Sequence, residues 1–301
     1  MDRLEAMSIL VTAAEAGSLS AAARRLGTPL ATVSRKVSEL EAHLSTRLLN
    51  RSSRRLTLTD AGQSYVAACK RILDDVEEAE RAASGEYSAP RGDLIITAPI
   101  VFGRLHVLPV VIAFIRAYPE INIRLVQADR TVSLAEEHID LAVRIAELPD
   151  SSMIAVRLGA IRRVVCASPT YLAARGAPRH PSDLAAHDCI ALEGPASLSA
   201  WTFVTGKSET TVTLRPRLSV NTAEAAVDAA VAGLGLTRVL SYQTAQARRA
   251  GTLALALEEF ELPPWPVSLV YPSQRLLPLK LRAFIDFATP RLKAALAAGG
   301  V

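Results

Sequence analysis

The chain has 301 residues, of which 50% are apolar and 21% are charged. This composition excludes a largely disordered protein, and the length exceeds that of an ordinary single domain. The first residues are acidic where a signal peptide would be basic. The longest apolar run, 107–115, contains Pro109 and is far shorter than a membrane span. We therefore expect a cytoplasmic protein of two or three folding units, with no membrane partner.

All of the net positive charge lies in the first fifth of the chain. Residues 1–58 contain nine basic and five acidic side chains, whereas the remaining residues contain 25 of each. A basic module joined to a neutral one is typical of a protein that binds a polyanion with one end.

Three short amphipathic helices are predicted at the N-terminus. Apolar residues recur at helical spacing over 4–14. A second helix runs from Ser18, its predicted cap, to Gly27, and a third begins with Thr28 as its cap. The spacing of these three helices predicts a helix-turn-helix.

The third predicted helix has an apolar face, Val33, Val37 and Leu40, that would pack on the first two helices. Its opposite face is polar near the N-terminus, as in a helix that enters the major groove of DNA. On charge alone, the solvated face of a small helical bundle is an equal alternative. The candidate DNA contacts here and at the start of the second helix are Ser18, Ser20, Pro29, Thr32, Ser34, Arg35 and Lys36.

Residues 47–58 predict a short β-hairpin, because two apolar pairs flank a polar, basic tip. Such a hairpin would cover the helices and place its tip on the DNA backbone or in the minor groove. Arg51, Arg54 and Arg55 are the candidate contacts, and the first 58 residues thus predict a winged helix-turn-helix.

The ordered succession of these motifs resembles the LysR-type transcriptional regulators. The matching segments are AAEAGSLSAAARRLG at 13–27, VSR at 33–35, LE at 40–41, LLNR at 48–51 and LTLTDAG at 56–62. The sequence departs from the family at Leu30 and Ala31, where many relatives carry serines. The resemblance implies a DNA-binding transcriptional regulator that responds to a small molecule.

One long helix is predicted from residue 59 to about 84, because the segment has no proline and one early glycine. Its apolar positions follow the a/d spacing of a coiled coil. They are Tyr65, Cys69, Ile72, Val76, Ala79 and Ala83. A surface helix packed on its own chain is the alternative, whereas the resemblance implies that this helix makes a homodimer. Turn-forming residues over 84–92 predict a hinge and a domain boundary.

The remainder alternates strand-like and helical segments, which predicts an α/β domain with a largely parallel sheet. Strands are expected at 94–97, 121–127, 139–144 and 163–167, and helices at 105–118 and 223–231. Segments 142–144, 168–172 and 232–235 are typical of the LysR effector domain. This resemblance implies two α/β subdomains like those of a periplasmic binding protein (type 2), with a ligand cleft between them.

The expected organisation follows from the resemblance and the hinge. A DNA-binding domain over 1–58 is followed by a linker helix and hinge over 59–90. An effector-binding domain occupies 91–301, with subdomain I at about 91–162 and 268–301 and subdomain II at about 163–267.

Ligands of open α/β sheets lie beyond the carboxyl ends of the strands. That rule selects Thr97, Ala98, Pro99, Phe102, Arg144, Asn221 and Thr222, with Thr131 as a further candidate effector contact. Helix N-termini and an arginine suit a carboxylate or another anion, so we expect an anionic small-molecule effector. A structural salt bridge is an equal alternative for Arg144.

The sequence contains no motif typical of a catalytic site, so we do not expect an enzyme. We also expect no metal and no cofactor. The histidines lack metal-ligand spacing, and the glycines of 232–235 lack the third glycine of a dinucleotide fingerprint and follow a helix. Close packing is the simpler role for these glycines. Cys166 and Cys189 could form a redox pair, although buried cysteines usually act as small hydrophobic residues.

The predicted function is that of a LysR-type transcriptional regulator, which would form a homodimer or a homotetramer. An α/β ligand-binding protein that oligomerises through its N-terminus, or an uncharacterised enzyme, are the alternatives.

Overall fold

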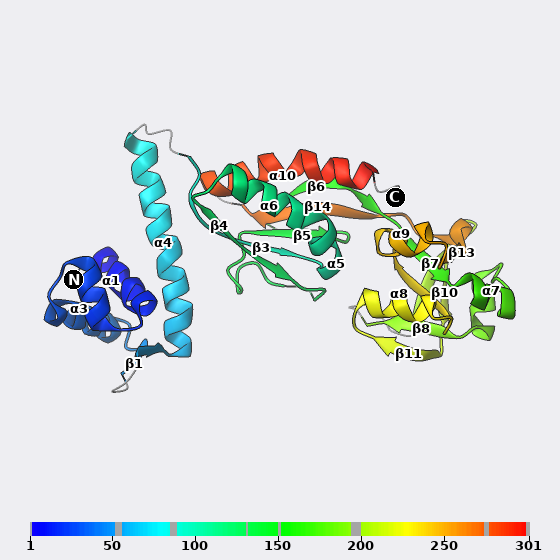
Figure 1. Ribbon diagram of the computed structural model, residues 1–301, viewed down its shortest axis with the longest axis horizontal. Coiled ribbons are helices and arrows are strands. Elements are labelled where there is room, and N and C mark those ends of the chain that lie inside the picture. Colours follow the sequence, from blue (N-terminus) through cyan, green and yellow to red (C-terminus); the bar gives the residue numbers. More distant parts are fainter. Residues whose placement is uncertain are drawn as a thin grey trace. The chain divides into compact units, whose positions relative to one another are not determined.

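A computed structural model describes residues 2–51, 56–84, 89–130, 132–149, 152–193, 200–273 and 277–298. The chain divides into two units, residues 1–88 and 89–301 (Figure 1). The first unit consists of helices and one hairpin, and the second contains all the other strands.

The first unit has the predicted helix-turn-helix, hairpin and long helix. Its elements are α1 (Arg3–Ala16), α2 (Leu19–Leu26), α3 (Leu30–His43), β1 (Leu49–Arg51), β2 (Leu56–Leu58) and α4 (Asp60–Ser84). Ser18 caps α2 as predicted, because its hydroxyl accepts a hydrogen bond from the backbone N–H of Ala21 at 3.0 Å. The prediction that Thr28 caps α3 is wrong. Its hydroxyl donates to the Leu26 carbonyl, and Pro29 occupies the cap position without a side-chain bond.

A single core joins the three helices to the hairpin and to the start of α4. It includes Leu10 from α1, Val37 and Leu40 from α3, Leu48 beside β1, and Val66 from α4. Glu41 fixes the hairpin on α3, because its Oε1 accepts hydrogen bonds from the backbone N–H groups of Leu48 and Leu49 at 2.8 and 3.0 Å.

The first turn of α4 packs directly against the hairpin. The Thr59 hydroxyl caps α4 by accepting from the N–H of Gly62 at 2.9 Å, and it donates to the Arg47 carbonyl at 2.8 Å. A β-carbon at Gly62 would overlap the backbone carbonyl of Leu48, so only glycine allows this approach. The start of the long helix is thus part of the same folding unit as the three helices and the hairpin.

The sequence left two alternatives for α4, a helix packed on its own chain and a helix that pairs with a second chain, and its side chains differ along its length. Cys69 is fully buried and Val66 is nearly so, because this part of the helix packs on α1. Ile72, one turn further on, is 41% exposed, and α4 extends beyond the three helices (Figure 1). The N-terminal part of α4 therefore packs on its own chain, whereas its C-terminal part presents uncovered apolar side chains.

The second unit contains two five-stranded sheets. The sheet of subdomain I has the order β4 (Ile121–Gln127), β3 (Gly92–Ala98), β5 (Leu141–Ile145), β14 (Trp265–Pro272) and β6 (Met153–Ile161). The sheet of subdomain II has the order β11 (Pro216–Val220), β8 (Cys189–Leu192), β12 (Leu236–Leu240), β7 (Arg163–Ala167) and β13 (Ala254–Ala256). A hairpin of β9 (Ala200–Thr205) and β10 (Ser208–Thr213) belongs to subdomain II.

The expectation of a largely parallel sheet is wrong, because both sheets are mixed. In subdomain I, β3 is parallel to β4 and β5, but β14 is antiparallel to β5 and β6. In subdomain II, β8 is parallel to β11 and β12, but β7 is antiparallel to β12 and β13. The chain crosses to subdomain II after β6 and returns through β14, and the returning strand runs against its neighbours.

Helices cover the sheets. Subdomain I has α5 (Ile100–Phe102), a π-helical turn η1 (Gly103–Val107), α6 (Leu108–Ala117) and α10 (Leu279–Ala298). Subdomain II has α7 (Pro169–Arg175), α8 (Ala223–Val231), α9 (Ser241–Arg249) and the short 3₁₀ turns η2 (Pro181–Ala186) and η3 (Glu258–Phe260). The helix predicted at 105–118 therefore begins earlier, at Ile100, and the one predicted at 223–231 is confirmed.

One helix of the described chain, residues 100–117, is long and apolar enough to cross a membrane by length and composition alone. Its inner side is part of the subdomain I core, where the Phe114 ring meets that of Phe284 from α10 at 5.1 Å. Helices α6 and α10 pack on each other and along the edge strands of the sheet (Figure 1). These contacts are those of a helix covering the sheet of an α/β subdomain.

Candidate nucleic-acid interface and effector region

The recognition helix α3 has a clear division between packed and free faces. Val33, Val37 and Leu40 are fully buried against the other helices. Arg35 points away from them with its side chain 61% exposed, and it pairs with Glu39 at 2.7 Å. An exposed pair of this kind contributes about 0.3–0.5 kcal/mol, so Arg35 can exchange it for a phosphate or a guanine edge.

Lys36 has a different environment from its neighbour. Its ammonium group lies 2.5 Å from the carboxylate of Glu5 in α1, and its side chain is only 14% exposed. Lys36 therefore links α3 to α1 within the fold, while Arg35 is available on the outer face.

The other predicted DNA contacts lie at the N-terminal ends of α2 and α3 and in the hairpin. Ser20 and Pro29 are exposed, and Thr32 and Ser34 are half-buried. The Ser18 hydroxyl is engaged as the cap of α2. Arg51 lies in β1, where its backbone pairs with Leu56, and Arg54 and Arg55 lie outside the described residues.

Leu30 is a surface residue that the sequence analysis did not select as a contact. It is the first residue of α3, and 46% of its surface is exposed. A large apolar residue directly after Pro29, outside the buried stripe of Val33, Val37 and Leu40, was the sequence signal for this position. Arg24 and Arg25 are also exposed nearby in α2, and Arg25 pairs with Glu15 at 3.3 Å.

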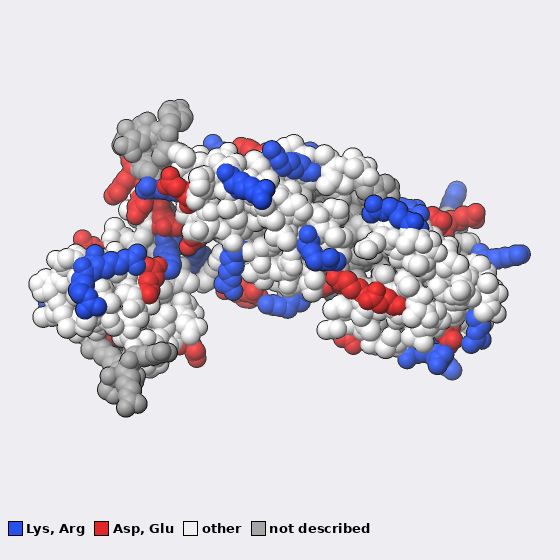
Figure 2. Space-filling view, in the orientation of Figure 1, with Lys and Arg blue, Asp and Glu red and all other residues white. Residues whose placement is uncertain are grey.

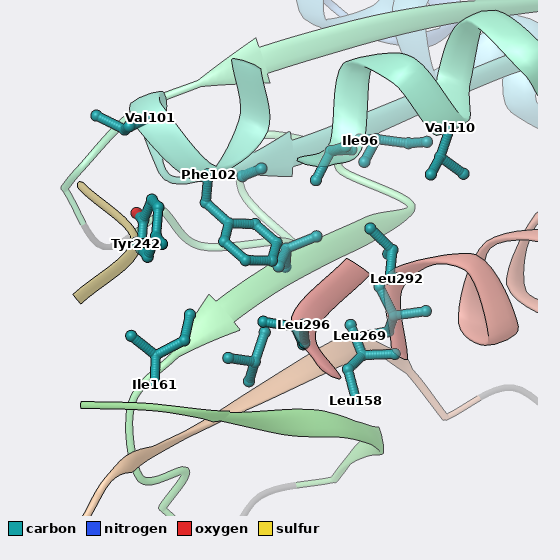
Figure 3. Close-up of a cluster of buried hydrophobic side chains, with 14 of the residues drawn as sticks. Ile96, Val101, Phe102, Val110, Leu158, Ile161, Tyr242, Leu269, Leu292 and Leu296 are labelled. Carbon is teal, nitrogen blue, oxygen red and sulfur yellow. The ribbon is translucent and has the colours of Figure 1, made fainter. Parts of the chain in front are cut away.

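The predicted effector residues after β3 are largely enclosed. Thr97 is buried and its hydroxyl donates to the Val126 carbonyl at 3.0 Å. Ala98 is buried as well. The fully buried ring of Phe102 meets the ring of Tyr242 edge-to-face at 5.5 Å, so the two subdomains touch through these aromatic side chains (Figure 3).

Two helix N-termini lie in the predicted region, and each already has an acidic group nearby. Pro99 precedes α5, and the N–H of Ile100 donates to the carboxylate of Asp129 at 3.0 Å. Thr222 caps α8 by accepting from Ala225 at 3.4 Å, with the exposed Asn221 just before it. Glu224, in the first turn of α8, lies 3.7 Å from Arg104 of η1. An anion at either terminus would therefore compete with a carboxylate of the protein.

Arg144, on β5, is the one cation among the predicted effector contacts. It is half-buried, donates a hydrogen bond to the backbone carbonyl of Val132, and burial lowers its pKa. Within the described part of the chain, no carboxylate lies within ion-pair distance of Arg144, so the salt bridge considered from the sequence is not formed there. Thr131 lies outside the described residues.

The structure excludes a disulfide between Cys166 and Cys189. Cys166 lies in β7 and Cys189 in β8, and β12 runs between these strands. Two strand spacings are about 10 Å, beyond the reach of a disulfide. Both thiols are buried, and burial raises the pKa of Cys166 to about 12 and that of Cys189 to about 11. Gly235 has the packing role expected, since a β-carbon there would overlap the Asp188 carbonyl, whereas Gly233 is required by its left-handed backbone, with φ +83°.

Family models match both units of the chain. Residues 4–63 match the model described as "Bacterial regulatory helix-turn-helix protein, lysR family", and residues 88–293 match the "LysR substrate binding domain". The chain belongs to the LysR family. It is a LysR-type DNA-binding transcriptional regulator with a substrate-binding effector domain, and the family consists of transcriptional regulators rather than enzymes.

Relatives cover almost the whole LysR-type chain. An HTH-type transcriptional regulator of Xanthomonas campestris is 36% identical over 94% of this chain and 84% of its own length. An HTH-type transcriptional repressor of Pseudomonas aeruginosa is 34% identical over 95% of this chain and 91% of its own.

Solved structures of LysR-type regulators have the same fold. CrgA of Neisseria meningitidis matches with a TM-score of 0.61 and 31% identity over 96% of this chain and 98% of its own. The virulence activator AphB of Vibrio cholerae matches with a TM-score of 0.60 and 27% identity over 95% of this chain and 98% of its own. LysR-type regulators bind DNA and small-molecule effectors, and they oligomerise.

Proposed function

We propose that this LysR-type regulator reads its operator with the N-terminal ends of α2 and α3 and with the β1–β2 hairpin. The observation that carries the proposal is Arg35, a weakly paired cation on the outer face of α3. Ser20, Pro29, Thr32 and Ser34 would contact bases or backbone beside it, and Arg51, Arg54 and Arg55 would contact DNA through the hairpin. Ser18 and Lys36, which have partners within the fold, would act mainly by positioning these elements.

The proposed division of labour follows the elements. Residues 1–58 bind DNA, 59–90 link and dimerise the chains, and 91–301 bind the effector in the cytoplasm, without catalysing a reaction. Two half-sites on separate protomers are the usual way for such a motif to gain specificity.

The test of DNA recognition is a mobility shift with the DNA upstream of the protein's own gene, followed by selection from random duplexes. We expect a competitor-resistant shift that weakens steeply with salt. Arg35→Ala should weaken binding about tenfold or more, because a guanine contact is worth about 1–3 kcal/mol. The control Arg249→Ala changes an exposed arginine of α9 and should bind normally. Unchanged binding by Arg35→Ala would refute the docking mode.

The proposed effector is a small anion that binds between the subdomains, with its carboxylate facing Arg144. A half-buried guanidinium without a described acidic partner supports this chemistry. Thr97, Ala98, Pro99, Phe102, Thr131, Asn221 and Thr222 would surround it, with local rearrangement where the side chains are now enclosed. Movement of the subdomains would then alter the angle between the DNA-binding domains and the bend of the DNA.

A thermal-shift screen of small carboxylic acids tests this site. We expect at least one acid to stabilise the wild type and not Arg144→Ala, while Arg144→Ala still binds the operator. If every stabilising acid acted equally on Arg144→Ala, that arginine would not be in the effector site.

Self-association is supported by two uncovered apolar faces. The first is on α4, where Ile72 and Ala79 are exposed and Val76 is half-buried. The second is a stripe of exposed residues on the helix of residues 100–117, namely Leu105, Leu108, Ile112 and Ile115. A dimer through the first face and a pairing of dimers through the second would give a homotetramer.

A further inference from the structure

A second cationic cluster lies in subdomain II, away from Arg144. Arg163 begins β7 and Arg238 lies in β12, its antiparallel neighbour. Leu240 is opposite Arg163, and Val165 is opposite Arg238. Because residues two apart on a strand share a face, the two guanidinium groups are diagonal neighbours on one face of the sheet.

Aromatic rings flank both arginines. The Arg163 guanidinium carbon lies 4.1 Å from the centroid of the Trp265 ring. That of Arg238 lies 5.4 Å from the Trp201 ring and 5.8 Å from the Phe203 ring. Trp201 and Trp265 are the two tryptophans of the chain.

The hydrogen bonds of the cluster leave some of its buried polar atoms without a described partner. Arg238 donates one hydrogen bond, at 3.0 Å, to the Thr202 carbonyl, and the Nε of Arg163 is buried without a partner. Thr205 follows Trp201 and Phe203 on the same side of β9, and its hydroxyl is also buried and unpartnered. Within the described residues, no carboxylate lies within ion-pair distance of either arginine. Glu209, in β10, is the acid whose charge favours protonated Arg163.

The positive charge of Arg238 is disfavoured in this environment. Burial lowers the pKa of Arg238 to about 10, and the positive charge of Arg163 adds to the shift. Buried charges in proteins are normally paired, because removing an ion from water is costly without a counter-ion. Two neighbouring arginines with orphaned polar groups therefore provide a place for an anion.

We propose that Arg163 and Arg238 bind the carboxylate of a small aromatic acid, with Trp201, Phe203 and Trp265 as the apolar surroundings. Two cations beside Glu209 leave a net charge of +1, which suits a monocarboxylate better than a doubly charged phosphate. The planar guanidinium fork matches a carboxylate.

This site bears on the connection between the subdomains. Arg163 directly follows the crossing from β6, and Trp265 starts the return strand β14, where it pairs with Ile161. A ligand held by both would contact the two segments through which the chain crosses. The proposal goes beyond the effector site at Arg144 and requires neither that site nor DNA binding.

Tryptophan fluorescence of the full chain tests the proposal, because both tryptophans belong to the cluster. Sodium benzoate is the probe, titrated at constant ionic strength against chloride. We expect a saturable change in the wild type that is about tenfold weaker or more in Arg163→Gln and in Arg238→Gln, since each loses a charge-assisted contact. Glu209→Gln should bind benzoate more tightly, because it removes the competing carboxylate.

The controls separate this site from others. Arg144→Ala should keep the signal, as should Arg249→Gln. If Arg238→Gln fails to fold, judged by circular dichroism, Arg163→Lys replaces it and should bind several-fold more weakly while remaining folded. The proposal is overturned if the wild type gives no saturable change or if both glutamine variants keep full affinity. It is also overturned if sulfate and acetate give the same change, which would mean an adventitious ion only, or if Arg144→Ala alone abolishes the signal.

Discussion

Leu30 is an exposed apolar side chain at the start of the recognition helix α3. It occupies the first position of α3 with 46% of its surface exposed, next to the exposed Pro29 and Ala31. Apolar side chains in the major groove contact the methyl group of thymine. Arginine and serine recognise hydrogen-bonding groups instead, so Leu30 would add a requirement that its polar neighbours cannot supply.

We predict that Leu30 contacts a thymine methyl group in the operator. Replacing each thymine of a selected operator by deoxyuridine removes one methyl group at a time. At one position, the wild type should lose about 0.8 kcal/mol, or about fourfold in affinity, the value of one buried carbon. Leu30→Ala should bind more weakly overall and show no further loss at that position. The same losses in both proteins at every position would exclude this contact.

The contrast between Arg35 and Lys36 shows what sequence reasoning misses at this scale. Both were predicted on one polar face, and both are basic. Only the fold reveals that Glu5, 31 residues away, engages Lys36 and leaves Arg35 on the outside. Helical spacing predicts which residues are buried, but it cannot predict the long-range partners of the residues at the border of a face.

At the scale of elements, α4 is packed on its own chain in its N-terminal part and exposes apolar side chains further along. Its a/d pattern continues from buried Cys69 to exposed Ile72, so one stripe packs first on α1 and then remains uncovered. Burying an isoleucine contributes about 1.5–3 kcal/mol, which makes Ile72 a strong candidate for contact with a second chain.

We predict that Ile72→Glu weakens the dimer, because it would place a charge in an apolar seam. Size-exclusion chromatography with light scattering measures the effect. Gln63→Glu introduces the same side chain at an exposed position of the same helix and should not alter the assembly. Ile112→Glu, on the other apolar stripe, should convert tetramers to dimers. An unchanged mass for Ile72→Glu would place the interface elsewhere.

Strands were predicted more accurately than their directions. The limits of β4 and β7 agree with the sequence prediction, because short apolar, β-branched runs are strong local signals. The antiparallel pairing of β14 with β5 and β6 could not be predicted from that pattern, since β14 follows β5 by more than a hundred residues. Local periodicity identifies an element, whereas its neighbours in a sheet depend on how the whole chain returns.

At the scale of the molecule, the second unit is held together by one continuous core that draws on both subdomains. Phe102 and Val110 of subdomain I and Tyr242 of subdomain II belong to the same cluster of buried side chains (Figure 3). Cys166 of subdomain II is part of that cluster as well. Acidic and basic side chains are mixed on the unit's visible surface (Figure 2), and residues 89–301 contain 22 basic and 18 acidic side chains, a small net charge of +4. Its stability should therefore depend on burial more than on long-range charge.

The buried thiols of subdomain II allow the contribution of burial to stability to be measured. The pKa of Cys166 is raised by burial to about 12, whereas the unfolded thiol ionises near 9. Because the folded chain holds the proton of Cys166 more tightly than the unfolded chain, proton binding contributes to stability, and this contribution is fully present below about pH 9. It is lost as the pH rises towards 12, because the unfolded state ionises first.

We predict that the free energy of unfolding of the wild type falls more between pH 7.5 and 10.5 than that of Cys166→Ala. The difference should be about 2 kcal/mol, which is the free energy of ionising a thiol 1.5 pH units above its unfolded pKa. Denaturant titration at both pH values measures it, and the other titrating groups cancel in the comparison. The same burial should leave Cys166 and Cys189 unreactive towards a disulfide reagent at pH 8 until the protein is unfolded. An equal fall in both proteins would show that Cys166 ionises as readily in the folded chain as in the unfolded one.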